Sequence, residues 1–99
     1  MERVNPPLWI QSARTVFAAL YGEKKGRAVC DAVIPGVLVD FRGMLDRAEP
    51  GTVVRETYRL DDKKGDVLLE GRRTAEGRRL TRLDVAGRSV DLGAGGAVI

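Results

Sequence analysis

The spacing of apolar residues changes at Glu49-Pro50-Gly51, and this change constrains the fold more than any other feature of the sequence. Before this point, apolar residues recur every three or four positions, the period of a helix with one buried face. After it, they alternate with polar residues, as in a half-buried β-strand. The order predicts a single α+β domain over 1–99, with a helical half at 6–48, an antiparallel β half at 52–92 and a flexible tail at 93–99.

The helical half contains two to three helices. Asn5 before Pro6 is typical of a helix N-terminus, and the pattern predicts a first helix from Pro6 to Tyr21. A second helix is expected from Glu23 or Lys24 to Ile34, where Pro35 should end or kink it. The stretch 36–48 fits a third helix, although Val37-Leu38-Val39 alone could also form a buried strand.

The β half predicts a four-stranded antiparallel meander with short loops. The expected strands span 52–60, 66–74, 78–85 and 88–92, and the loops between them lie at 61–65, 75–77 and 86–87. Alternation places Val54, Tyr58 and Leu60 on one face of the first strand. By the same count, Thr81, Leu83 and Val85 share a face of the third strand.

Composition argues against an enzyme and against a bound metal or cofactor. The chain has no histidine, so the commonest general base and the commonest metal ligand are missing. Cys30 is the single cysteine, which excludes an intramolecular disulfide and is expected to be buried. Asp61, Asp62 and Asp66 surround a turn that contains two lysines, and their spacing does not match a calcium loop. We therefore expect no catalytic residue, no metal site and no cofactor.

The single free thiol, which fits a reducing cytosol, and the hydropathy pattern indicate a cytoplasmic protein without a membrane role. The formal charge is +3, and no apolar run approaches the ~18 residues that a membrane span needs. The N-terminus lacks the apolar segment of a signal peptide. Asn5 and Gln11 are the only residues with side-chain amides and 31% of the residues are charged, a composition typical of a thermophilic or GC-rich source.

The densest local feature is an arginine-rich hairpin in the β half. Its five arginines flank a tight turn at Glu76-Gly77, and they are Arg72, Arg73, Arg78, Arg79 and Arg82. Strand alternation predicts that Arg72 and Arg73 lie on opposite faces, and that Arg78 and Arg82 share a face. Such a hairpin could contact the phosphates of DNA or RNA without reading sequence, and nucleic-acid backbone binding is the first hypothesis. Tyr58 is the only aromatic residue of the β half, so base stacking is not expected.

Two other interpretations stay open. The arginines could pair instead with Glu56, Glu70, Asp84 and Asp91 on neighbouring strands. In that case the chain would be an accessory subunit or a homo-oligomer that associates through sheet edges and has no nucleic-acid role. Three helices before a hairpin would also fit a winged helix-turn-helix, but Val37, Leu38, Val39 and Phe41 occupy the positions where polar base-reading residues belong.

Overall fold

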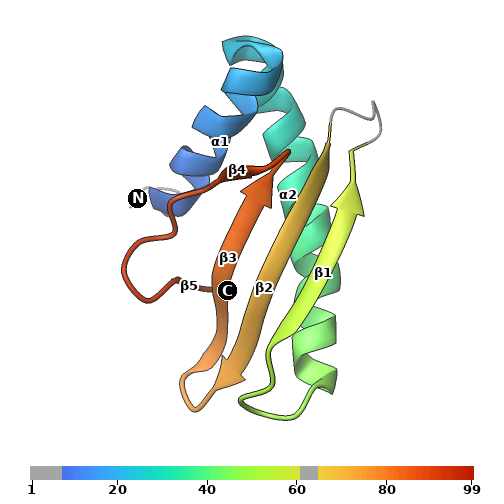
Figure 1. Cartoon of the computed structure of the whole chain (residues 1–99), viewed down its shortest axis with the longest axis vertical. Coiled ribbons are helices and arrows are strands. Elements are labelled where there is room, and N and C mark those ends of the chain that lie inside the picture. Colours follow the sequence, from blue (N-terminus) through green and yellow to red (C-terminus); the bar gives the residue numbers. More distant parts are fainter. Residues whose placement is uncertain (1–7, 61–64) are drawn as a thin grey trace, which may run out of the picture.

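Two helices cover one face of an antiparallel sheet in the computed structural model, which describes residues 8–60 and 65–99 (Figure 1). The helices are α1 (Leu8–Tyr21) and α2 (Glu23–Arg47). The strands are β1 (Val54–Arg59), β2 (Asp66–Thr74), β3 (Gly77–Val85), β4 (Arg88–Ser89) and β5 (Ala97–Val98). The predicted α+β class with antiparallel strands is confirmed. The predicted helix start at Asn5-Pro6 and most of the 61–65 loop lie outside the described residues.

The second and third predicted helices are one continuous helix, so an end of the helix at Pro35 and the strand alternative at Val37-Leu38-Val39 are wrong. The buried residues of α2 form a single stripe that runs past the proline: Cys30, Ile34, Leu38, Phe41 and Leu45. Pro35 lies on the exposed side of this helix. Water can therefore hydrogen-bond the Asp31 carbonyl that the proline leaves without a backbone donor, while burial of the stripe holds the helix together.

The helices meet closely because α2 carries a glycine at the contact. Gly22, with φ of 89°, separates α1 from α2. A Cβ atom on Gly26 would lie 2.5 Å from Cα of Ala18, so only glycine allows this approach. Phe17 is fully buried at the same contact, where it joins the core formed by α1, α2 and the sheet.

A β-bulge in β3 changes which side chains share a face. Glu70 pairs with Arg82 and Gly71 pairs with Leu80, which leaves Thr81 without a partner in β2. The Thr81 hydroxyl donates to the Glu70 carbonyl over 3.2 Å. Leu80 and Leu83 are both buried against the helices, although their positions differ by an odd number. Thr81 is exposed, so its predicted place beside Leu83 and Val85 is wrong, because one extra residue reverses the alternation.

The outer edge of β3 is covered by the C-terminal segment. β4 pairs with the end of β3 and β5 pairs with its beginning, through Arg79 with Val98 and Leu80 with Ala97. The sheet therefore has five strands rather than four, and β4 ends at Ser89 instead of continuing to residue 92. The segment 93–99 was expected to be a flexible tail, yet it contains β5 and buries Ala97. On the opposite edge of the sheet, β1 pairs only with β2 among the described strands.

Candidate functional site

The hairpin arginines fall on both faces of the sheet, and two of them lie on the helix side. Arg73 donates through Nη2 to the main-chain oxygen of Ala48. The Nη1 of Arg78 lies 2.9 Å from Oδ2 of Asp46. Both acceptors are at the C-terminal end of α2, where unpaired carbonyls and the helix dipole favour cations. These two arginines thus join the helix to the sheet.

The other three hairpin arginines lie on the sheet face that no described helix covers, here called the open face. Arg82 therefore lies on the opposite face from Arg78, contrary to the sequence prediction, because of the bulge at Thr81. Arg79 donates to the Gly95 carbonyl over 3.0 Å and lies near Glu76. The Arg72 side chain is exposed and has no hydrogen-bond or ion-pair partner within residues 8–60 and 65–99.

Carboxylates of the open face engage most of its arginines. Glu70 lies 2.6 Å from Arg55 and 3.7 Å from Arg82, while Asp84 lies 2.7 Å from Arg82. Asp84 is only 7% exposed, and it also accepts a hydrogen bond from Ser89. Two of the four carboxylates that the sequence suggested as arginine partners, Glu70 and Asp84, have that role. The other two accept hydrogen bonds from nearby backbone amides, Glu56 from Thr57 and Asp91 from Gly93.

The open face nevertheless keeps more arginines than carboxylates. The strand register places five arginines on it, Arg55, Arg59, Arg72, Arg79 and Arg82, and three strand carboxylates, Asp66, Glu70 and Asp84. Glu76 in the adjoining turn lies 3.6 Å from Arg79. The face is a charged network with a small positive excess, in which Arg72 is the arginine without a described partner.

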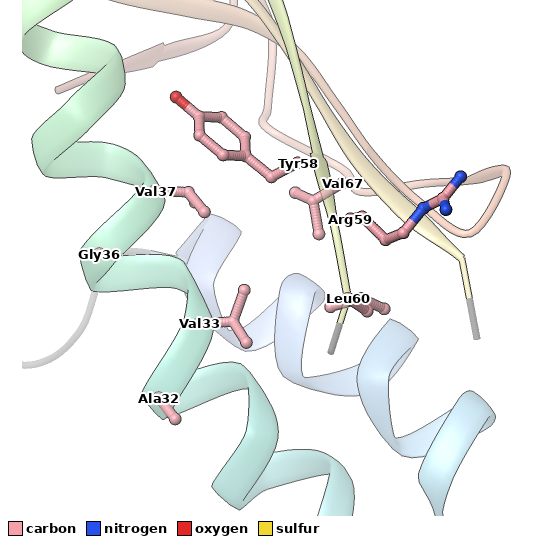
Figure 2. A pocket seen from close by; sticks show the side chains of 8 residues that line it. All are labelled: Ala32, Val33, Gly36, Val37, Tyr58, Arg59, Leu60 and Val67. Atoms are coloured by element: carbon pink, nitrogen blue, oxygen red, sulfur yellow. The ribbon is translucent and has the colours of Figure 1, made fainter. Parts of the chain in front are cut away.

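A groove between α2 and β1 is a second candidate site, which the arginine pattern did not reveal (Figure 2). It has a volume of about 360 Å³. Ala32, Val33, Gly36 and Val37 line it from the helix, and Tyr58, Arg59, Leu60 and Val67 line it from the sheet. Figure 2 shows Val33 and Val37 pointing toward the sheet and the Arg59 guanidinium turned away from α2. Ala32 and Gly36 keep the helix wall low, and these small residues were the signal in the sequence.

The groove runs beside the open backbone edge of β1. The Leu60 amide donates to the Gly65 carbonyl of the β2 side, so the backbone groups of even-numbered residues in β1 point toward β2. The amide and carbonyl groups of Arg55, Thr57 and Arg59 therefore point outward. The Thr57 amide donates to its neighbour Glu56 over 3.3 Å. An outward row of donors and acceptors thus lies next to an apolar wall.

One hydrogen bond fixes the aromatic side of the groove. The Tyr58 hydroxyl donates to Oδ2 of Asp40 in α2 over 2.5 Å. Burial and this hydrogen bond raise the pKa of Tyr58 above its ordinary value, so the hydroxyl keeps its proton. The bond ties β1 to α2 and sets the orientation of the ring beside the groove.

Cys30 is a further chemistry-bearing residue of the described chain. Cys30 is 1% exposed, and burial, followed by the charge of Asp31, raises the pKa of its thiol to about 11. A thiol with such a pKa is a poor nucleophile near neutral pH. Within the described residues, acids and cysteine form no group of three that could hold a metal ion, and neither helix has the length and apolar character to span a membrane.

Comparison with known proteins found no matching family model, no similar curated protein and no similar solved structure.

Proposed function

We propose that this protein is a non-enzymatic interaction module that binds an extended segment of a protein partner along β1. The observation that carries the proposal is the position of the α2–β1 groove directly beside the outward backbone groups of Arg55, Thr57 and Arg59. A bound segment would extend the sheet by one strand. Its backbone would pair with β1, and alternate side chains would enter the groove.

The pairing of the hairpin arginines supports this choice over nucleic-acid binding. Arg73 and Arg78 contact the end of α2, and Arg82 is engaged by two carboxylates. Each of these contacts would have to be given up or shared before the guanidinium could bind phosphate. The outward backbone groups of β1 have fewer competing contacts. Within the described chain, the Thr57 amide is the outward amide with a hydrogen bond, a weak one to Glu56.

The test is a titration of ¹⁵N-labelled protein with a peptide of six residues, the length of β1, that alternates threonine and valine. Strand addition should shift the amide signals of Arg55, Thr57 and Arg59 and slow their hydrogen exchange. A Cβ at Gly36 meets nothing within 4 Å, so this position has room for a larger side chain. Gly36→Leu should fill the groove and abolish these shifts. Gly36→Ala is the matched control and should keep them. Absence of shifts at millimolar peptide, or shifts that survive Gly36→Leu, would overturn the proposal.

A second candidate function is contact of the open face with the phosphate backbone of DNA or RNA. The observation that favours it is Arg72, which is exposed and lacks a described partner on a face with a small positive excess. The phosphate contacts would come from Arg72 together with Arg79 and Arg59. Binding of this kind would be weak, independent of sequence and sensitive to salt.

The second candidate is tested by fluorescence anisotropy of labelled single-stranded DNA, duplex DNA and RNA at about 50 mM and 200 mM salt. Binding should weaken by about tenfold or more at the higher salt, and Arg72→Glu should reduce it further. Arg47→Glu in α2 makes the same charge change away from the open face and should have a smaller effect. No binding at the lower salt would exclude this function.

A further inference from the structure

We infer that the segment bound along β1 belongs to a different protein and alternates acidic with apolar residues. This inference rests on the proposed function and adds the chemistry of the partner. It is carried by the exposed arginines of β1, by the charges that a second copy of β1 would bring, and by the apolar wall of the groove.

The geometry of the strand divides the bound segment into two kinds of position. Side chains of directly opposed residues in neighbouring strands lie on the same face of the sheet. Residues opposite Arg55, Thr57 and Arg59 would therefore lie on the open face. Residues between them, opposite Glu56 and Tyr58, would lie on the helix face, where the groove begins.

On the open face, the β1 arginines favour a bound segment that carries carboxylates. The side chains of Arg55 and Arg59 are 62% and 76% exposed. Arg55 shares Glu70 with Arg82, and Arg59 lies 3.7 Å from Asp66, a long contact for an ion pair. Both guanidinium groups can accept a second carboxylate, and acidic residues opposite them would form cross-strand pairs.

On the helix face, the groove favours a bound segment with apolar side chains. Val33 and Val37 point from α2 toward Leu60 and Val67, and the low wall at Gly36 leaves room between helix and strand (Figure 2). A branched apolar residue near Tyr58 would cover these side chains and remove them from water.

A second copy of this chain fits the β1 edge poorly because β1 would meet its own charges. Antiparallel self-pairing centred on Thr57 sets Arg55 against Arg59 of the other copy. Pairing centred on Arg55 or Arg59 sets identical arginines together, and pairing centred on Glu56 joins two carboxylates. Pairing centred on Tyr58 places Glu56 opposite Leu60. Like charges directly opposite each other destabilise a strand pair, which disfavours four of these five registers. The fifth register places the Glu56 carboxylate against the apolar side chain of Leu60.

The test compares three labelled peptides of six residues, again the length of β1, that alternate valine with glutamate, with threonine or with lysine. Anisotropy should show that the glutamate peptide binds on the order of tenfold more tightly than the lysine peptide, with a smaller difference at high salt. Arg59→Glu should reverse this preference. Arg88 is an exposed arginine in β4, at the edge of the sheet opposite β1. Arg88→Glu makes the same charge change there and should leave the preference intact. Gly36→Leu should abolish binding of all three peptides.

The outcomes separate the inference from the function on which it rests. Equal binding of all three peptides, still abolished by Gly36→Leu, would overturn the acidic preference and leave the interaction module standing. No binding of any peptide at millimolar concentration would overturn both. Sedimentation of the protein alone tests whether a second copy binds the β1 edge. A dimer that Gly36→Leu dissociates would overturn the inference that the bound segment belongs to a different protein.

Discussion

Arg72 and Arg73 show how neighbouring residues of one type acquire different roles. They differ by one position in β2, so the pleat sends Arg72 to the open face and Arg73 toward the helices. Arg73 is partly buried, and its Nη2 donates to the Ala48 carbonyl, while its Nε is buried without a hydrogen-bond partner. The role of each arginine in this hairpin follows from its face rather than from its charge.

We expect Arg73→Met to lower the free energy of unfolding by about 1–3 kcal/mol. The substitution keeps an apolar stem but removes the charged donor from the C-terminal end of α2. Arg72→Met is the matched control and should change stability by less than about 0.5 kcal/mol, since the residue is exposed and has no described partner. Urea denaturation measures both values. Equal effects of the two substitutions would contradict the assignment of Arg73 to the helix end.

The Cys30 thiol should make stability depend on alkaline pH. Its folded pKa is about 11 and its ordinary value is 9.0, so between these values the unfolded chain releases the thiol proton while the folded chain retains it. The free energy of unfolding must then fall as pH rises above 9.0. Below this value the thiol is protonated in both states and contributes no pH dependence.

Cys30→Ala isolates this effect because the variant keeps every other titrating group. The stability difference between wild type and variant should shrink by up to about 1.4 kcal/mol per pH unit above the ordinary thiol value. Urea denaturation at neutral pH and at several alkaline pH values measures this difference. A difference that stays constant with pH would show that the thiol is not buried as described.

At the scale of elements, α2 continues through Pro35 because its buried stripe outweighs the local cost of proline. Proline in a helix interior removes one backbone hydrogen bond and crowds the preceding turn. Because Pro35 is exposed and makes no core contact, Pro35→Ala should raise the free energy of unfolding by about 1–3 kcal/mol. Val39→Ala, at another exposed position of α2, should change it by less than about 0.5 kcal/mol. Thermal or urea unfolding checks both variants, and no gain from Pro35→Ala would contradict the continuous helix.

The elements that could be predicted are those in which one residue pattern decides the structure. Periodicity identified the helical first half, the three long strands and their antiparallel order. The continuation of α2 through Pro35 could not be predicted. The free-energy cost of proline is local, whereas the burial that offsets it is against a sheet formed by later residues. The bulge at Thr81 and the pairing of β5 with β3 likewise depend on neighbours that no local pattern specifies.

The candidate site was predictable only in part, for the same reason. The sequence shows that arginines cluster in the hairpin, but the bulge decides that Arg82 joins Arg55 on the open face and that Arg78 joins α2. The groove exists because α2 lies across the edge of the sheet and presents Gly36 and Ala32 there. Small residues in a helix are common, so their importance became visible only with the packing.

At the scale of the whole molecule, the response of stability to salt should show whether attraction within ion pairs or repulsion among arginines prevails. The chain carries a formal charge of +3, which is small enough for local pairs to outweigh overall repulsion. Contacts such as Arg55–Glu70 and Arg82–Asp84 are attractive and partly exposed to solvent. Added salt screens such attractions within a Debye length of about 10 Å at 0.1 M.

We therefore expect the melting temperature to fall as sodium chloride is raised from low concentration, with a loss of stability of about 1 kcal/mol or less. Chloride is chosen because sulfate would strengthen burial and mask the effect. Glu70→Gln should reduce the salt dependence, since Glu70 contacts both Arg55 and Arg82. A melting temperature that rises with chloride would mean that repulsion among the arginines prevails in solution. The open face would then be poised to attract polyanions, and phosphate-backbone binding would become the stronger of the two functions.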